Sequence, residues 1–452
     1  MNSIDLLKER KNALLENSKD IREKISSIID EGSFVELNTF SFAKNNFYGN
    51  EDSLGVITGY ATIEGCPIYV VAQNSKVLNG GLSYANCKKI CECVEKAGSS
   101  EIPVLYLLDS QGVQIGEGVS VLEGISEVLA YSNRLKGVAP QIAVAVGNVL
   151  GSSAILADNC DFTFVVGDAC ISYASPAVIA ASSKGKDGVA NAKNGVATFK
   201  VKTISEVKEK IVKIFDTLPK FAGYEVDGQD DLNRTAPALN AKVTVDGLIE
   251  ATFDKDSFIK MNEGFEDSVI TGIGRAGGIS VASIIMADDE NGVDLTLSNI
   301  LKIKNFIHFA DENALPIILF VNSNGFKLDS NTFNSQVTTE FMNMLDALSA
   351  IKRITVVYGK AIGVSYSAFV SKASGSDYTY AFAGSKISLL DGYAGISATY
   401  GTVCEEDVDK LKAEFDASQD SFNSAKLGCV DNIIEPEFVR QYVLSALQML
   451  IS

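Results

Sequence analysis

The sequence repeats itself once at a nearly constant separation, and this repeat limits the possible folds more than any other feature. The segment V-I-T-G starts at positions 56 and 269, and Pro103 and Pro316 are likewise 213 residues apart (269 − 56 and 316 − 103). D-F-T-F at residues 161–164 and D-Y-T-Y at residues 377–380 follow in the same order, 216 apart (377 − 161). A period this long is not that of a solenoid, so we expect each copy to form a domain.

The central pair of repeated segments joins a strand to a helix through two glycines. Residues 142–153 read I-A-V-A-V-G-N-V-L-G-S-S, and residues 354–365 read I-T-V-V-Y-G-K-A-I-G-V-S. In the first copy we predict a buried strand over residues 142–146, a tight turn from Gly147, and a buried helix after the serines. Such glycines let the backbone approach a ligand closely, and the free N–H groups of a helix's first turn can hold a negative oxygen.

Strand-like and helix-like apolar patterns alternate within each copy. This alternation predicts an internally duplicated α/β fold, in which each domain is built from β-α-β units with mostly parallel strands. At 452 residues the chain is also too long for one ordinary core. We predict an N-terminal domain at residues 1–219, a polar linker at residues 220–241, and a C-terminal domain at residues 242–452.

Composition and charge narrow the class of protein. Hydrophobic residues make up 46% and charged residues 21% of the chain, as in a soluble globular protein. The formal net charge of −18 argues against a nucleic-acid partner or an anionic membrane surface. No uncharged apolar run reaches ~18 residues and no secretory signal is found, so we expect a cytoplasmic protein that does not insert into a membrane. Eight cysteines in such a chain suit reduced thiols.

Few side chains suit acid–base or metal chemistry. The single histidine, His308, lies in an amphipathic helical pattern, and a Ser-His-Asp or Cys-His enzyme would depend on it alone. Cys87, Cys91 and Cys93 form the one cysteine cluster, but no C-x-x-C pair or nearby histidine completes a zinc site. We therefore expect buried helix cysteines, no metal, and chemistry supplied by backbone dipoles and a bound cofactor.

Several sequence blocks together carry a family resemblance. They include N-G-G-L-S-Y-A-N-C-K-K-I at residues 79–90, L-L-D-S-Q-G-V-Q-I-G-E-G-V at 107–119, G-V-A-P-Q-I-A-V-A-V-G at 137–147 and G-C-V-D-N-I-I-E-P at 428–436. With these blocks the chain resembles the carboxyltransferase subunits of biotin-dependent enzymes, such as the β subunits of acetyl-CoA and propionyl-CoA carboxylases and the α subunits of acyl-CoA decarboxylases. The resemblance implies two crotonase-like halves.

The resemblance also implies a mechanism that needs no side-chain base. In that family carboxybiotin releases CO2, and the biotin left behind takes the α-proton of the acyl-CoA. Two backbone oxyanion holes stabilise the two negative oxygens, and removing one such donor costs about 3 kcal/mol. By resemblance, Gly151 and Ser152 form the acyl-CoA hole, and Val364 and Ser365 form the biotin hole.

Other positions are assigned to binding. The residues expected to bind the acyl-CoA and biotin groups beside the two holes are Gly80, Gly81, Ser110, Gly112, Gly325, Phe326 and Gly363. The lysines that we expect near the CoA phosphates are Lys88, Lys89, Lys184 and Lys186.

Two absences in the sequence bear on partners. No Met-Lys-Met biotin acceptor and no G-x-x-x-x-G-K-[ST] phosphate loop occur. Biotin should then arrive on a separate biotin carboxyl carrier protein, with a biotin carboxylase or a membrane decarboxylase subunit as further partners. Because the family places its site between the N half of one subunit and the C half of another, the resemblance implies a homo-oligomer.

The sequence departs from the family pattern at the expected site. The first hole has Ser152 where the family usually has a second glycine, and the second has Val364-Ser365 where the family has Gly-Ala. Gln114 replaces the family's arginine, and residues 322–326 (N-S-N-G-F) lack its Asp and Pro. Side chains at the holes narrow the approach to them, most of all the β-branched Val364. These changes suit an altered acyl substrate, a variant reaction or a subunit that no longer catalyses.

Two further functional hypotheses therefore stand beside a catalytic carboxyltransferase. One is a non-catalytic structural subunit of a carboxyltransferase or decarboxylase complex, which should bind neither acyl-CoA nor biotin. The other is a crotonase-type acyl-CoA enzyme that works without biotin and needs a positioned carboxylate, for which Glu117 is the nearest candidate.

Overall fold

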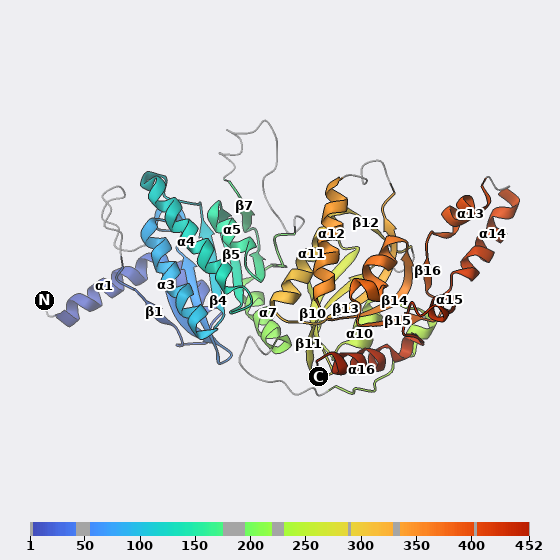
Figure 1. Cartoon of the computed structure of the whole chain (residues 1–452). Helices are drawn as coiled ribbons and strands as arrows, with labels where there is room; N and C mark the ends of the chain where they lie inside the picture. Colours follow the sequence, from blue (N-terminus) through green and yellow to red (C-terminus); the bar gives the residue numbers. More distant parts are fainter. Residues whose placement is uncertain are drawn as a thin grey trace. The chain divides into compact units, whose positions relative to one another are not determined.

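The computed structural model describes residues 3–41, 55–174, 195–218, 230–287, 291–328, 335–401 and 405–451. Its internal contacts divide the chain into two compact units (Figure 1). The N-terminal unit comprises Met1–Glu225 and Asn262–Phe265, and the C-terminal unit comprises Val226–Met261 and Glu266–Ser452. None of the helices in the described part of the chain is long and apolar enough to cross a lipid bilayer.

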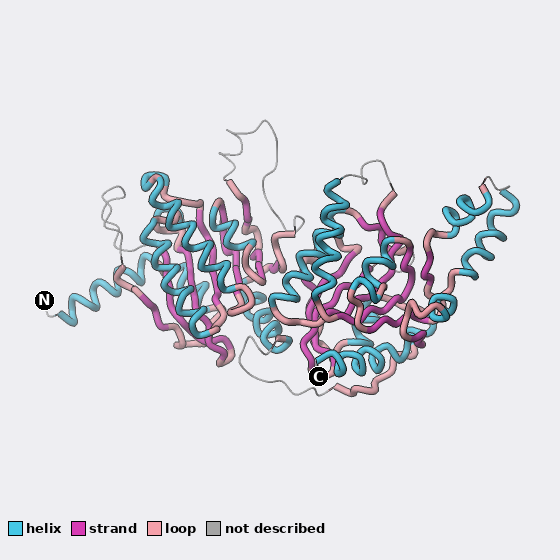
Figure 2. The backbone as a smooth tube through the Cα atoms, in the orientation of Figure 1, coloured by secondary structure: helices cyan, strands magenta, loops and turns pink. Residues whose placement is uncertain are grey.

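The N-terminal unit is built around one sheet of short strands with helices packed on it (Figure 2). Its strands are β1 (Val35–Leu37), β2 (Val56–Ile63), β3 (Cys66–Gln73), β4 (Val104–Ser110), β5 (Gln141–Leu150), β6 (Phe162–Val166), β7 (Cys170–Ser172) and β8 (Phe199–Val201). Its helices are α1 (Ser3–Asn17), α2 (Lys19–Ser26), α3 (Tyr84–Ser100), α4 (Val119–Leu135), α5 (Ser152–Asp158) and α7 (Ile204–Thr217).

The sheet order of this unit is β1-β2-β3-β4-β5-β6-β8, and β7 pairs with the end of β5. The first three strands are antiparallel neighbours, whereas β3 to β8 run parallel. The carboxyl ends of β4 and β5 therefore lie side by side, which is where an open α/β sheet most often binds its ligand.

The C-terminal unit repeats this arrangement. Its strands are β9 (Ile259–Met261), β10 (Val269–Ala276), β11 (Ile279–Met286), β12 (Val293–Leu295), β13 (Ile317–Phe326), β14 (Arg353–Ile362), β15 (Tyr378–Phe382), β16 (Lys386–Ser388) and β17 (Asn432–Ile434). Its helices are α9 (Ala238–Ala241), α10 (Val245–Thr252), α11 (Leu297–Glu312), α12 (Ser335–Ala350), α13 (Gly392–Tyr400), α14 (Glu405–Ser418), α15 (Ser421–Lys426) and α16 (Val439–Ile451).

The two sheets match strand for strand. The order in the C-terminal unit is β9-β10-β11-β13-β14-β15-β17, and β16 pairs with β14 as β7 pairs with β5. Strand β12 beside β13 has a lesser counterpart in the N-terminal unit, a single parallel bridge between Leu82 and Val113. The duplicated α/β fold predicted from the repeat is therefore confirmed.

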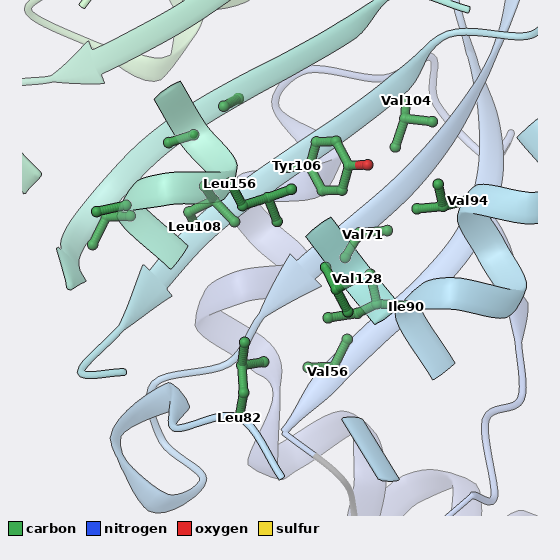
Figure 3. Close-up of a cluster of buried hydrophobic side chains, with 14 of the residues drawn as sticks. Val56, Val71, Leu82, Ile90, Val94, Val104, Tyr106, Leu108, Val128 and Leu156 are labelled. Carbon is green, nitrogen blue, oxygen red and sulfur yellow. The ribbon is translucent and has the colours of Figure 1, made fainter. Parts of the chain in front are cut away.

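Helices α3, α4 and α5 cover one face of the N-terminal sheet, and apolar side chains fill the space between them (Figures 1 and 3). In Figure 3, Tyr106 and Leu108 of β4 meet Ile90 of α3, Val128 of α4 and Leu156 of α5. Complete burial of each such aliphatic side chain stabilises the fold by about 1.5–3 kcal/mol. This packing fixes the start of α5 against the end of the sheet.

The cysteines and the histidine that the sequence analysis rejected as catalytic residues lie in helices. Cys87, Cys91 and Cys93 are buried in α3, as expected. Burial raises the pKa of the Cys87 thiol to about 12 and that of Cys91 to about 11, so both stay protonated. His308 is exposed on α11.

Candidate active site

The turn after β5 leaves two backbone N–H groups outside the regular hydrogen bonding. Gly151 has φ +61°, and its own N–H donates to the carbonyl of Ser172 in β7 at 2.9 Å. Within α5, Ala154 N–H is the first to bond back, to Gly151 O at 3.1 Å. The N–H groups of Ser152 and Ser153 precede it and so have no partner inside the helix. They are donors of the kind that stabilises a developing oxyanion.

Gly147 does not form a turn, which corrects the sequence prediction. Strand β5 continues through it to Leu150, and the chain turns only at Gly151. A Cβ atom on Gly147 would lie within 2.7 Å of both carboxylate oxygens of Asp109 on β4. The glycine is required by this neighbouring side chain and not by a bend in the backbone.

Among the glycines predicted to line the acyl-CoA side, Gly112 lies beside Gly151, and Gly80 lies against the end of β4. The Cβ position of Gly151 lies 3.7 Å from the Cα of Gly112, and that of Gly80 lies under 3.0 Å from the carbonyl of Asp109. Ser110 is fully buried, and its hydroxyl accepts the Gly112 N–H at 3.2 Å. The backbone of Gly80 thus approaches that of Asp109 more closely than a side chain would allow, whereas Gly112 and Gly151 are in ordinary contact.

Gln114, which by the resemblance replaces an arginine, supports the loop at residues 78–81. Its side-chain amide donates to the carbonyl of Gly81 at 3.0 Å, and a Cβ on Gly81 would lie 2.6 Å from that nitrogen. Gln114 is buried. The replacement therefore exchanges a charged group for a neutral amide that holds the loop in place.

The side chain of Ser152 adds a hydroxyl to the first turn. Its Oγ is buried and has no hydrogen-bond partner among the described residues. A buried, unpaired hydroxyl costs about 1–3 kcal/mol relative to a bonded one, so a ligand oxygen at this position would be favoured by it. The serine is thus compatible with an oxyanion hole.

The turn after β14 has the same construction. Gly363 has φ +55°, and its N–H donates to the carbonyl of Ser388 in β16 at 2.8 Å. The next two residues, Val364 and Ser365, lead into a single π-helical turn at Tyr366–Val370. The backbone N–H of Gly363 is used by the sheet, as is that of Gly151 in the other unit.

The side chain of Val364 lies beside the second turn. Its Cγ2 atom lies 3.6 Å from the Cβ position of Gly325, which has φ +91° at the end of β13. Phe326 follows and packs edge-to-face on Phe341, with ring centroids 4.9 Å apart. The structure thus brings Gly325, Gly363 and Val364 together, with Phe326 directed into the α12 packing.

The four lysines expected near CoA phosphates differ in availability. The Lys88 ammonium pairs with Glu127 at 2.6 Å, and hydrogen bonds to Glu127 and Tyr84 raise its pKa. Lys89 is only 5% exposed and donates to the carbonyl of Val56 at 2.9 Å, and burial lowers its pKa to about 8. The expectation for Lys89 is therefore wrong. Lys184 and Lys186 lie outside the described residues.

Glu117, the candidate base of a biotin-independent enzyme, has a structural partner. It closes the short 3₁₀ turn Ile115–Glu117, and its carboxylate accepts the N–H of Tyr84 at 2.7 Å. Tyr84 is the first residue of α3, so the carboxylate caps this helix.

Sequence reasoning missed one buried polar contact at the first turn. Gln73, the last residue of β3, hydrogen-bonds Ser153 and the backbone of Asp109. The one available signal was a glutamine that ends an otherwise apolar strand, C-P-I-Y-V-V-A-Q.

Comparison with known proteins gives consistent matches along the whole chain. A family model described as "Carboxyl transferase domain" matches residues 14–452. The propionyl-CoA carboxylase carboxyltransferase subunit of Haloferax mediterranei is 28% identical, over 95% of this chain and 90% of that protein. The methylmalonyl-CoA decarboxylase subunit alpha of Veillonella parvula is 29% identical over the same shares. The methylmalonyl-CoA carboxyltransferase 12S subunit of Propionibacterium freudenreichii subsp. shermanii is 26% identical over 95% of this chain and 88% of that protein.

Solved structures agree on the fold. A transcarboxylase 12S structure, described as a hexamer assembly with methylmalonyl-coenzyme A and methylmalonic acid bound, superposes with a TM-score of 0.89 at 23% identity, over 99% of this chain and 95% of the other. A single-chain, multi-domain long-chain acyl-CoA carboxylase gives 0.84 at 18% identity, over 99% of this chain and 50% of the other. These superpositions support the duplicated α/β fold over the full length of the chain.

Proposed function

The chain belongs to the carboxyl transferase domain family, and on that premise we propose that it is a biotin-dependent carboxyltransferase. It moves a carboxyl group between biotin on a carrier protein and a short acyl-CoA. The family members named above act on propionyl-CoA or methylmalonyl-CoA, so a three-carbon acyl group is the first candidate substrate.

The observation that carries this proposal is the pair of matched turns. In each half a glycine at positive φ gives its N–H to the sheet, and the N–H groups of the following residues are left for a ligand oxygen. Fixed donors of this kind stabilise charge in the transition state more than in the ground state, and each is worth about 3 kcal/mol. A reaction that forms two negative oxygens needs two such sets.

We assign one turn to each substrate. Because the Gly151 N–H is engaged by Ser172, the expected pair of donors shifts by one residue, and the N–H groups of Ser152 and Ser153 hold the thioester oxygen while the α-carbon carries negative charge. The residues around this oxygen are Gly80, Gly81, Ser110, Gly112 and Gly151. Val364 and Ser365 hold the ureido oxygen of biotin, with Gly325, Phe326 and Gly363 beside them.

The second turn fits a biotin group. Gly325 and Gly363 both have positive φ and no side chain, and Gly363 N–H is already engaged by Ser388, so the free donors are those of the next two residues. Biotin, when bound, supplies the carboxyl group and a ring that can accept a proton. The residues of this chain hold the ring oxygen in place, and the side chain of Val364 narrows the access of biotin to the turn.

We propose a biotin carboxyl carrier protein as the partner that delivers biotin, with a biotin carboxylase or a membrane decarboxylase subunit in the wider complex. The protein should form a homo-oligomer in which the N half of one copy faces the C half of another. The relative transcarboxylase 12S is described as a hexamer. We place the protein in the cytoplasm, since the seven cysteines in the described residues are free thiols.

A structural subunit remains the second candidate because one observation favours it. The side chain of Val364, which by the resemblance replaces a glycine, lies beside Gly325. The biotin-independent alternative has less support, since Glu117 caps α3.

Titration calorimetry separates the candidates. The purified chain is titrated with acetyl-, propionyl- and malonyl-CoA, and then with free biotin. A carboxyltransferase binds one of the thioesters in preference to the others and binds biotin as well. A folded oligomer that binds neither would establish the structural subunit, and binding of a thioester with Glu117→Ala abolishing turnover would establish the biotin-independent enzyme.

A further inference from the structure

One buried glutamine connects three elements at the first turn. Gln73 is 1% exposed and ends β3. Its Oε1 accepts the backbone N–H of Asp109 in β4 at 3.1 Å, and its Nε2 donates to the hydroxyl of Ser153 in α5 at 3.0 Å. A single carboxamide thus links the ends of two strands to the residue two places after Gly151.

The chemistry of the partners fixes how this carboxamide is oriented. A backbone N–H can only donate, so the oxygen must face Asp109 and the NH2 group must face Ser153. Ser153 is fully buried. The contact therefore acts on the first turn of α5 from within the protein, away from any ligand.

In the C-terminal unit, Ser365 is the counterpart of Ser153, and a different contact holds it in place. Gln73 pairs with Val56 across β2 and β3, and Met286 pairs with Val269 in the same place across β10 and β11. Met286 has no carboxamide. There Ser365, two places after Gly363, instead bonds the hydroxyl of Ser323 on β13 at 2.6 Å.

Each unit therefore anchors the second residue after its glycine to a neighbouring strand. Only the anchor differs: an amide from β3 in the N-terminal unit and a hydroxyl from β13 in the C-terminal unit. Because both units hold this residue by a hydrogen bond, although the bonding groups differ, we infer that the positions of Ser153 and Ser365 matter to their turns.

We propose that Gln73 is a positioning residue for the acyl-CoA turn. Through Ser153 it sets the direction of the Ser152 and Ser153 N–H groups, without touching substrate. The inference rests on the proposed function for the chemistry that the turn performs. Because donors displaced by about 1 Å can lower a rate by roughly 10²-fold, such an anchor acts on turnover more than on binding.

The test uses Gln73→Met, which removes both hydrogen bonds with a side chain that the other unit already accommodates at the same register. The matched control is Gln141→Met. Gln141 is fully buried and hydrogen-bonds the side chain and backbone of Ser132 at the opposite end of β5. Ser153→Ala, alone and combined with Gln73→Met, isolates the single bond to the turn.

The first readout is amide hydrogen exchange of the peptide spanning residues 150–158, which needs no substrate. We expect Gln73→Met and Ser153→Ala to raise exchange there at least tenfold, with no such rise in Gln141→Met. Exchange in Gln73→Met equal to that of the wild type would overturn the proposal.

The second readout is the formation of propionyl-CoA from methylmalonyl-CoA with free biotin as the acceptor of the carboxyl group. We expect kcat to fall at least tenfold in Gln73→Met with KM within threefold, and the double variant to be no worse than Gln73→Met alone. A fall that Gln141→Met reproduces, or additive losses in the double variant, would contradict a positioning role. If the wild type shows no turnover, the proposed function fails, and the exchange measurement still decides whether Gln73 holds the turn.

Discussion

The carboxylate of Asp109 occupies the space that a side chain on Gly147 would need. The C-terminal unit repeats the relationship, since a Cβ on Gly359 would lie within 3.0 Å of every terminal atom of the Asn322 side chain. Asn322 also accepts the N–H of Lys360 at 2.9 Å. In both units a polar side chain of one strand thus lies over a glycine of the next strand just before the turn, and in the C-terminal unit it also hydrogen-bonds that strand.

Gly147→Ala should therefore be destabilising even though the residue lies in a strand. We expect a loss of about 1–3 kcal/mol in the free energy of unfolding, because the added methyl group overlaps the carboxylate. Urea unfolding measures it. In the Asp109→Ala background the same substitution should cost far less, and a cost that does not change would show that the crowding is not the cause.

Much of the fold could be predicted because the information was local or repeated. The order of strands and helices follows from apolar patterns, and the nearly constant offset of 213 to 216 residues (269 − 56 and 377 − 161) indicates that two domains share one arrangement. The sequence pattern predicts a turn at Gly147, because a glycine after an apolar run is compatible both with a bend in the backbone and with a neighbouring side chain that leaves no room for Cβ. Asp109, the residue that explains it, belongs to another strand.

The details of the site depended on contacts that spacing does not encode. Gln73 and Ser153 are 80 residues apart (153 − 73), and no periodicity relates them. The burial of Lys89, by contrast, could have been predicted, because its helix neighbours Asn86, Ile90 and Cys93 are also buried on α3. A helical projection of this segment would have placed Lys89 on the inner face and kept it out of the phosphate site.

The first oxyanion hole can be tested by removing a backbone donor. Ser152→Pro deletes the N–H at the first position of α5, where proline is otherwise tolerated. We expect kcat to fall about 100-fold or more, corresponding to ~3 kcal/mol. Ser152→Ala keeps the N–H and should retain most of the rate. Equal losses in both variants would assign the role to the hydroxyl instead.

The second hole can be tested by removing the side chain that lies beside it. Val364→Gly removes the side chain that lies beside Gly325. We expect kcat/KM for free biotin to rise by up to about tenfold, or ~1.4 kcal/mol, with the Kd for acyl-CoA unchanged. A change in acyl-CoA affinity without a change for biotin would reverse the assignment of the two turns.

Equivalent aspartates bind the turn of the first hairpin in each unit, and each aspartate pairs with a different basic side chain. Asp254 accepts the N–H groups of Gly277 and Gly278 and pairs with the fully buried Arg440 at 2.6 Å. Asp30 makes the corresponding backbone bonds, but its cation, Lys208, lies 3.7 Å away and is partly exposed. Asp254→Asn leaves a buried charge with less compensation and should cost about 3–5 kcal/mol, whereas Asp30→Asn should cost no more than ~1–2 kcal/mol. Comparable losses in urea unfolding would contradict this ranking.

The same carboxylates make stability depend on acid pH. Burial raises the pKa of Asp254, but the hydrogen bonds from Arg440 and from the backbone outweigh it and hold the pKa below the ordinary 3.8. Asp30 is held below 3.8 in the same way, with Thr62 as its largest hydrogen-bond donor. A lowered folded-state pKa gives stability that is present above about pH 4 and is lost as the pH falls through the folded value. The urea concentration at the unfolding midpoint should thus decrease as the pH falls below 4, and it should decrease less steeply in Asp254→Asn. The same pH dependence in the variant and the wild type would show that Asp254 does not contribute.

The most direct measurement of the central claim is the rate at which the purified chain forms propionyl-CoA from methylmalonyl-CoA, with and without free biotin as the acceptor of the carboxyl group. We expect propionyl-CoA to form only when biotin is present, and we expect Ser152→Pro and Val364→Pro each to abolish most of its formation, because each removes one donor from one turn. Formation of propionyl-CoA that does not require biotin, or none by a folded chain that also fails to bind either compound, would contradict the assignment of the two turns to acyl-CoA and biotin.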